Sequence, residues 1–403
     1  MAARNRSRAR TPSTKKRIAV FLDGTWNTVN DNTNVWRMRA LCAPRSADGL
    51  VQCSYYDAGV GTIFGQKIRG GWLGVGMNEN IIDAYQWLIE NYNPEDDIFI
   101  FGFSRGAYTA RSLSGFISKC GLLKPGAPLS VNQLYDRYRR GSEPRTIRTL
   151  LEDNRNNVGT CTLEEEWIMK YSRKIQIKFV GIWDTVGALG IPYVPWTNWS
   201  DTDFLNTGVR TSNDFAFHAL AIDEHRKKFA PTLWTKTVKK GRPDPKATPP
   251  RTLPQVEQRW FVGAHANVGG GCQSDLLAQI PLKWMMQKAT LHGLSFREEV
   301  AIDGDVHRAP ISDSFREFMY GTYRVVKLNR RYYREIGAPP LETDIDVTNT
   351  INETIDASVF KRWRSDPEYR PPGLARWAKR YRVEPKDITT AIRADSPEVA
   401  VAD

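Results

Sequence analysis

The 403-residue chain has few cysteines, few histidines and no long apolar run. Its five cysteines are scattered and odd in number, with no C-x-x-C pair. This pattern argues against a disulfide framework or a structural zinc site and favours a reducing compartment. No stretch approaches the roughly 18 apolar residues of a membrane span. Because the sequence also lacks H-E-x-x-H and clustered carboxylates at metal spacing, we expect neither a metal nor another cofactor.

The amino-terminal residues lack the apolar core of a secretory signal. Residues 1–17 carry seven Lys or Arg and no acidic residue. This composition predicts a disordered basic arm over residues 1–16. We expect a cytoplasmic protein, or one exported without a cleavable signal. The net charge of +12 is compatible with contact to an anionic membrane surface, whereas specific nucleic-acid binding is not expected.

The most informative stretch of the sequence is residues 96–121. Residues 98–101 (IFIF) are typical of a strand buried on both faces, and residues 107–119 predict a helix. Between them stands the G-x-S-x-G pentad GFSRG, which places Ser104 on a sharp strand-to-helix turn. This is the nucleophile elbow of α/β-hydrolases. The alternative is that Ser104 only caps the helix.

The rest of the chain predicts an α/β fold. Strands are expected at residues 17–22, 51–56, 175–183, 229–234 and 258–263, and helices at residues 33–41, 80–92, 214–224 and 276–291. Because strands and helices mostly alternate, we predict a largely parallel sheet with helices on both faces. Residues 65–76 are expected to form a mobile loop and residues 236–251 a flexible surface loop.

The domain organisation follows from these patterns. We expect an α/β-hydrolase-like catalytic domain over residues 17–293, with lid or insertion segments at about 125–170 and 187–209. Strand patterns then stop. Residues 294–403 predict a helical C-terminal extension packed on the core, with helices at 360–364 and 374–382.

Three polar residues follow predicted strands: Ser104, Asp184 and His265. Functional residues of such sheets lie beyond the carboxyl ends of the strands. The chain order Ser, Asp, His is that of α/β-hydrolases, with serine as nucleophile, histidine as base and aspartate as its partner. Asp184 follows the sixth strand of that fold by our count, whereas the acid more often follows the seventh. Other candidate acids therefore remain, namely Asp203, Asp223 and Asp275.

Candidates for supporting roles lie near these residues. The first N–H of the helix, that of Arg105, is the first expected oxyanion donor, and the loop after the first strand would give the second from Gly24 or Thr25. Asp23 in the same loop and His218 in the predicted helix 214–224 are candidates for supporting the catalytic residues.

Two phosphate-related hypotheses fail on the residues present. Strand-D-G-T also opens haloacid-dehalogenase phosphatases, but Phe21 occupies the position of their nucleophilic aspartate. The glycine-rich segment 65–76 has neither G-K-[ST] nor a strand-linked G-x-G-x-x-G.

Six sequence motifs together resemble those of a known family. They are FLDGTWN (21–27), GVGT (59–62), GFSRGAYTAR (102–111), GIWDTV (181–186), HALAIDEHRKKF (218–229) and VGAHANVGGG (262–271). It is the domain-of-unknown-function family 2235, whose α/β-hydrolase proteins include the catalytic domain of type VI secretion phospholipase effectors. The resemblance covers about residues 17–290. It maps the family's triad onto Ser104, Asp184 and His265.

The resemblance implies a substrate class. We expect a serine hydrolase that cleaves carboxylic esters of lipids, most plausibly glycerophospholipids, through an acyl-enzyme. A secretion-system or immunity partner would accompany such a role. The alternative is a non-catalytic α/β-hydrolase fold that binds an anionic membrane or a protein partner.

Overall fold

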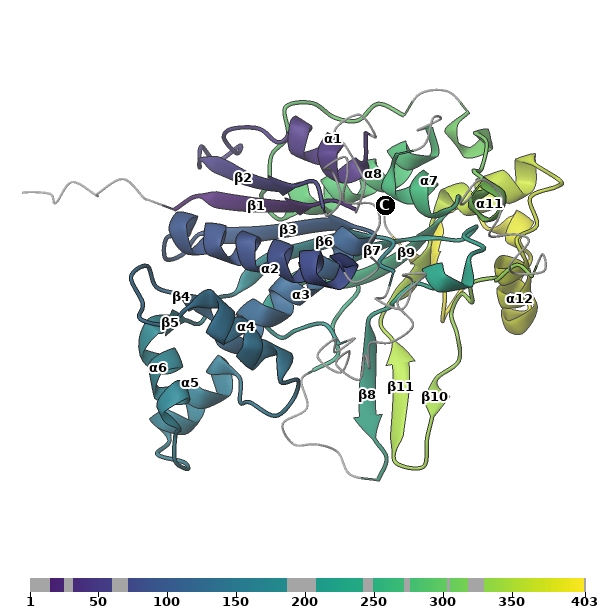
Figure 1. Ribbon diagram of the computed structural model, residues 1–403. Coiled ribbons are helices and arrows are strands. Elements are labelled where there is room, and N and C mark those ends of the chain that lie inside the picture. Colours follow the sequence, from purple (N-terminus) through teal and green to yellow (C-terminus); the bar gives the residue numbers. More distant parts are fainter. Residues whose placement is uncertain are drawn as a thin grey trace, which may run out of the picture.

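The computed structural model describes residues 15–24, 32–59, 72–186, 208–241, 249–271, 276–302, 305–317 and 330–401. Its centre is a nine-stranded sheet in the order β14-β13-β12-β9-β7-β6-β3-β1-β2 (Figure 1). The parallel strands are β1 (Arg17–Leu22), β2 (Gln52–Asp57), β3 (Asp97–Phe103), β6 (Ile177–Trp183), β7 (Asn213–Ala221), β9 (Val256–Phe261) and β12 (Glu353–Ile355). Two antiparallel strands, β13 (Ala391–Arg393) and β14 (Ala400–Val401), complete one edge. The prediction of an α/β fold with a mostly parallel sheet is confirmed.

Helices cover both faces of this sheet (Figure 1). Successive residues of a strand point to opposite faces. Ile18 and Val20 of β1 therefore pack in the core beneath α2 (Trp72–Asn91) and α3 (Arg105–Cys120). Ala19 and Phe21 pack in the core beneath α1 (Asn34–Leu41) and α8 (Leu276–Leu291). Burial on both sides explains why residues 18–22 of β1 are apolar at every position.

The predicted insertion at about 125–170 contains a helical layer outside α3. Its helices are α4 (Val131–Arg139), α5 (Ile147–Arg155) and α6 (Leu163–Tyr171), flanked by the short antiparallel strands β4 (Leu122–Leu123) and β5 (Ser172–Arg173). Capping boxes at Ser130 and Thr162 start α4 and α6. The predicted lid at 187–209 and the basic arm at 1–16 lie almost wholly outside the described residues.

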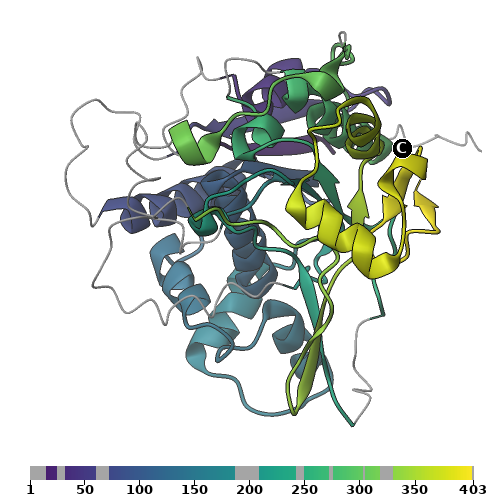
Figure 2. The same cartoon turned by 90° about the vertical axis from the view of Figure 1, so that its right-hand side faces the viewer.

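The C-terminal segment is more than the helical extension expected from the sequence. It contains α11 (Ala357–Ser365) and α12 (Pro372–Tyr381), where helices were predicted. It also contributes β12, β13 and β14 to the central sheet. Strand β11 (Asp346–Thr350) pairs with β10 (Leu341–Glu342) on one side and with β8 (Thr235–Lys239) on the other, in a second, antiparallel sheet. Figure 2 shows these C-terminal elements packed along the side of the domain.

Four local predictions are wrong. The predicted helix 214–224 is instead strand up to Ala221, the end of β7. The predicted strand 229–234 holds no strand and begins at the last residue of the short 3₁₀-helix η4 (Lys227–Phe229). Strand β8 instead begins at Thr235 and runs into the segment predicted as a loop. Helix α2 begins at Trp72, within the predicted loop 65–76. Strand β7 lies between β6 and β9, so burial on both faces removed the alternation that would have identified it.

The remaining short elements connect these layers. They are α7 (His265–Gly269), η5 (Val306–Arg308), α9 (Ser314–Glu317) and η7 (Pro385–Asp387). Among the helices that the structure describes, none is both long and apolar enough to cross a membrane.

Candidate active site

Ser104 occupies a strained turn between β3 and α3. Its φ is 58° and its ψ −119°, on the side of φ space that residues with a β-carbon rarely adopt. The hydroxyl makes no capping bond to the helix that follows, so the alternative role as a simple N-cap does not hold. The backbone N–H of Ser104 donates to the carbonyl of Trp183 at the end of β6, 3.1 Å away. The turn has the geometry of a nucleophile elbow.

The glycines of the pentad allow strand and helix to approach each other. A β-carbon on Gly102 would lie 2.4 Å from the carbonyl oxygen of Gly106. Gly106 in turn packs against the carbonyls of Leu22, the last residue of β1, and of Asp23, which follows it. Both outer positions of G-x-S-x-G are therefore occupied by residues without a side chain because backbone atoms fill the space.

The structure brings all three residues of the predicted triad together. Ser104 directly follows β3, Asp184 directly follows β6, and His265 comes shortly after β9. All three therefore lie at the carboxyl edge of the sheet. The Nε2 atom of His265 lies 2.8 Å from Oγ of Ser104. Its Nδ1 atom lies 2.6 Å from Oδ2 of Asp184. Hydroxyl, imidazole and carboxylate thus form one continuous hydrogen-bonded series.

The imidazole of His265 is held in a buried, aromatic setting. Its ring centroid lies 4.7 Å from that of Phe103 and 5.1 Å from that of Phe229. Its backbone N–H donates to Oε2 of Glu224 at 3.3 Å. Burial lowers the pKa of His265, and the hydrogen bond and charge of Asp184 only partly offset this effect. The ring is therefore neutral at neutral pH, the form that can accept a proton.

Asp184 is completely buried and receives donors from two directions besides His265. The N–H of Ala221 donates to Oδ1 at 3.0 Å. The guanidinium of Arg334 binds both carboxylate oxygens, Nη1 to Oδ1 at 2.5 Å and Nη2 to Oδ2 at 2.9 Å. Burial alone would raise the pKa of Asp184, but Arg334 and His265 hold it well below its usual range. Sequence reasoning missed Arg334, which lies 150 positions along the chain from Asp184.

The other candidate acids are occupied elsewhere or lie outside the described residues. Asp223 follows β7, the usual position of the acid, yet its Oδ2 accepts from the Gly263 N–H at 2.7 Å and the Tyr369 hydroxyl at 3.2 Å. Burial raises the pKa of Asp223. Asp23 accepts from its neighbours after β1, including the Thr33 hydroxyl at 2.5 Å and the Tyr56 hydroxyl at 3.0 Å. Asp203 and Asp275 fall in segments that the structure does not describe.

His218 supports the backbone next to the acid. It lies on β7, not on the predicted helix, and is fully buried. Its Nε2 accepts the N–H of Thr185, the residue after Asp184, at 3.1 Å. Burial lowers the pKa of His218 to about 3. The ring is therefore neutral, and it holds the turn that carries Asp184.

The expected oxyanion donors have different surroundings. Arg105 is the first residue of α3, so its backbone N–H lies at the positive end of the helix. The N–H of Gly24 donates to Oδ1 of Asp23 at 2.7 Å. Thr25 lies outside the described residues. The contact of the Leu22 and Asp23 carbonyls with Gly106 places the end of β1 beside the elbow, while the Gly24 N–H is engaged by Asp23.

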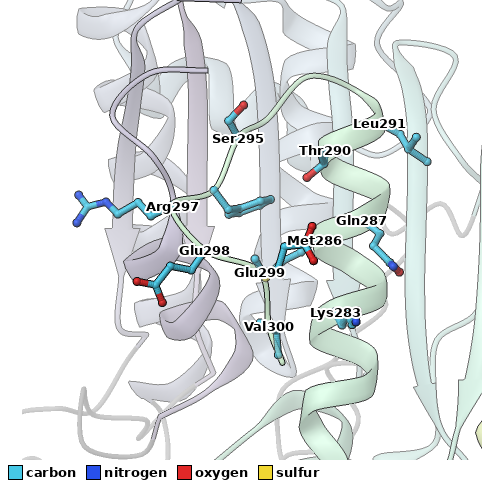
Figure 3. A pocket seen from close by; sticks show the side chains of 11 residues that line it. Lys283, Met286, Gln287, Thr290, Leu291, Ser295, Arg297, Glu298, Glu299 and Val300 are labelled. Atoms are coloured by element: carbon cyan, nitrogen blue, oxygen red, sulfur yellow. The ribbon is translucent and has the colours of Figure 1, made fainter. Parts of the chain in front are cut away.

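A cavity of about 530 Å³ lies away from these residues. Figure 3 shows it between α8, with Lys283, Gln287 and Thr290, and the segment that carries Ser295 to Val300. The N–H of Ser295 donates to Gln52, the first residue of β2, at 2.9 Å. This bond places Ser295, at one end of the lining segment, at the amino end of β2, and Figure 3 shows the segment running from there to Val300 along the strands.

An elbow serine, an imidazole and a carboxylate in hydrogen-bonded series, at the carboxyl edge of a mostly parallel sheet, define an α/β-hydrolase-like protein. A family model described as the type VI secretion system phospholipase effector Tle1-like catalytic domain matches residues 16–288. The chain belongs to this family. The resemblance inferred from the sequence motifs is confirmed.

Similar proteins were found by sequence and by structure. An uncharacterized protein of Saccharomyces cerevisiae, YEL023C, is 28% identical over 247 residues, which are 55% of this chain and 33% of that protein. The chain thus spans about a third of this relative. A crystal structure of an uncharacterized Pseudomonas aeruginosa protein aligns with 18% identity and a TM-score of 0.43, over 74% of this chain and 49% of that one. The Tle1 effector bound to the VgrG spike of the type 6 secretion system aligns with 18% identity and a TM-score of 0.31, over 64% and 51%.

Proposed function

We propose that the protein is a serine hydrolase that cleaves carboxylic esters of phospholipids through an acyl-enzyme. The observation that carries the proposal is the position of His265, whose two ring nitrogens lie within hydrogen-bond distance of Ser104 and Asp184. A nucleophile, a base and a group that orients the base are the three components of this mechanism.

The proposed first half-reaction transfers the acyl group to the enzyme. Neutral His265 accepts the proton of the Ser104 hydroxyl through Nε2 while Oγ attacks the ester carbonyl carbon. Asp184 holds the Nδ1–H tautomer and stabilises the imidazolium that forms. As the tetrahedral intermediate collapses, the imidazolium returns this proton to the leaving alcohol. Water then attacks the acyl-enzyme in the same way, with His265 again acting as base, and releases the fatty acid.

The negative charge of the tetrahedral intermediate requires donors beside Ser104. The backbone N–H of Arg105 lies at the amino end of α3, which favours an anion there. We propose that the second donor comes from the loop after β1. If Gly24 fulfils this role, its N–H exchanges Asp23 for the substrate oxygen. The neighbouring N–H of Thr25 is the other candidate.

The lipid substrate is inferred from family membership. A phospholipid ester fits the phospholipase effectors to which the chain belongs. One structural neighbour is bound to a VgrG spike. From the family description we propose delivery by a type VI secretion system, and protection of the producing cell by an immunity partner. The net charge of +12 would favour an anionic membrane surface.

The proposal is tested with purified wild type, Ser104→Ala and the matched control Ser118→Ala, a serine on the same helix. Hydrolysis of a short-chain p-nitrophenyl ester and of phospholipid vesicles is measured. We expect Ser118→Ala to match wild type and Ser104→Ala to be inert, since loss of a triad member removes about a million-fold of acceleration. Labelling of Ser104 by a fluorophosphonate probe is an independent readout.

The outcomes separate the alternatives. Vesicle hydrolysis that depends on Ser104 supports a phospholipase. Hydrolysis of the soluble ester alone retains the triad and rejects the lipid substrate. If wild type is inert and unlabelled across varied esters, the catalytic proposal fails, and the fold acts instead as a binding module for a membrane or protein partner.

A further inference from the structure

Arg334 reaches the candidate triad from the C-terminal segment, beyond residues 16–288 that the family model covers. Its side chain is only 1% exposed. Besides the two bonds to Asp184, Nη1 donates to the carbonyl of Ala221 at 2.7 Å and Nη2 to the carbonyl of Phe229 at 2.6 Å. The guanidinium thus makes four hydrogen bonds in a buried site.

These four bonds connect three elements. Asp184 follows β6, Ala221 ends β7 and Phe229 ends η4, the residue whose ring packs against His265. A planar guanidinium that binds a carboxylate through both nitrogens fixes its orientation as well as its position. Arg334 therefore fixes the direction in which Asp184 presents Oδ2 to His265.

The charge of Arg334 matters because Asp184 has no contact with solvent. A buried carboxylate is stable only when paired and hydrogen-bonded. His265 is neutral in the resting state, so it supplies a hydrogen bond but no positive charge. Of the groups bonded to Asp184 in the described structure, Arg334 provides the cation.

We propose that Arg334 is a positioning residue of the active site, which keeps Asp184 ionised and aligned with His265. The C-terminal segment is then part of the catalytic unit, although the family match ends before it. This inference rests on the proposed hydrolase function.

Removal of Arg334 should change the pH dependence of kcat/KM in a defined direction. The charged groups that face His265 are Asp184, Glu224 and Arg226, while Asp184 faces Arg334 and the fully buried His218. Without Arg334, Asp184 either takes up a proton at neutral pH or remains an unpaired carboxylate that stabilises the imidazolium. In the first case the acidic limb of kcat/KM follows the ionisation of Asp184, and in the second it follows the raised pKa of His265, so the limb moves to higher pH in both.

The test compares Arg334→Met with the matched control Arg362→Met in the full chain. Arg362 is also buried in the C-terminal segment, but its Nη1 donates to the carbonyls of His307 and Ala309 and does not contact the triad. For Arg334→Met we expect kcat to fall about 100-fold at pH 7 with little change in KM. We expect its acidic limb to move up by about one pH unit or more. In Arg362→Met the acidic limb of kcat/KM should stay at the pH of wild type.

A second variant keeps the test decisive if Arg334→Met does not fold. Arg334→Lys retains the positive charge but not the two-point contact, so we expect a reduced kcat with a smaller shift of the limb. If either variant, folded by circular dichroism, loses rate but keeps the acidic limb of wild type, Arg334 is structural only and the inference is overturned.

Failure of the hydrolase proposal can be told apart from failure of this one. If wild type hydrolyses no ester, the imidazole of His265 is titrated by NMR in protein with labelled histidines, with His265→Asn to assign its signal. A shift of its pKa in Arg334→Met, upward if Asp184 stays ionised and downward if Asp184 takes up a proton, supports the electrostatic role of Arg334 without reference to activity. An unchanged pKa overturns that role.

Discussion

Gly106 lies directly against Leu22: a β-carbon added to Gly106 would come within 2.1 Å of the Leu22 carbonyl oxygen. The contact joins the first turn of α3 to the end of β1. It sets how closely the helix that follows the candidate nucleophile approaches the neighbouring strand. The last glycine of the G-x-S-x-G motif is thus required by the packing of two backbones.

We expect Gly106→Ala to lower the free energy of unfolding by about 3 kcal/mol or more, because neither backbone can move aside cheaply. Denaturant unfolding measures the loss. The control is Gly49→Ala, where no atom lies within 4 Å of the added carbon and only the positive φ of 84° opposes the change. That variant should lose about 1–2 kcal/mol. Equal losses in the two variants would show that the close contact has no energetic weight.

The two aspartates after β6 and β7 should differ in their effect on catalysis. Asp184→Asn removes the acceptor that holds the Nδ1–H tautomer of His265, so we expect kcat to fall about 10⁴-fold. Asp223→Asn keeps an oxygen for the Gly263 N–H and the Tyr369 hydroxyl, and kcat should change less than about tenfold. Steady-state ester hydrolysis gives both values. A larger loss for Asp223→Asn would assign the acid to the other strand.

The activity should persist into mildly acidic solution. His265 must be neutral to act as a base, and burial lowers its pKa from an ordinary value of 6.5. Protonation therefore begins at lower pH than for an exposed histidine. We expect the acidic limb of kcat/KM, which reports the free enzyme, to have its midpoint below about pH 6.5. A midpoint above that value would mean that the carboxylate of Asp184 outweighs burial.

Acid should also destabilise the fold through His218. Its pKa is about 3 in the folded chain against an ordinary 6.5, so between these values the unfolded chain binds a proton that the folded chain excludes. The stabilisation is complete above about pH 6.5 and declines by about 1.4 kcal/mol per pH unit below it. Denaturant unfolding at about pH 7.5 and pH 5 measures how much the free energy of unfolding falls between these two pH values. This fall should be smaller in His218→Gln than in wild type, by about 1–2 kcal/mol. An unchanged difference would contradict the buried, neutral state.

Much of the central fold could be predicted from local sequence. The apolar run before Ser104, the pentad and the helix after it are adjacent in the chain, so the elbow has a local signature. The positions of Asp184 and His265 then followed from one rule, that functional residues of parallel sheets lie beyond strand ends. The sequence could not decide among the candidate acids, because the choice depends on which carboxylate reaches His265.

What the sequence could not predict depends on contacts between distant residues. Strand β7 contains Ala and Leu and is buried on both faces, so its pattern suited a helix equally well. The C-terminal strands β12, β13 and β14 are three residues long or shorter, too short for any period to show. Arg334 lies outside every regular element, and nothing in its neighbourhood indicates a partner 150 residues away.

The late position of Arg334 has a consequence for the newly made protein. Ser104, Asp184 and His265 are all synthesised before it, and about 70 residues separate His265 from Arg334. At about 5–20 residues per second, translation of this stretch takes several seconds. During that interval the nascent chain holds the candidate nucleophile and base without the cation that pairs with Asp184. If the protein cleaves lipids, that activity would therefore mature only after Arg334 has been made, which limits the time in which an unfinished chain could damage the membranes of its own cell.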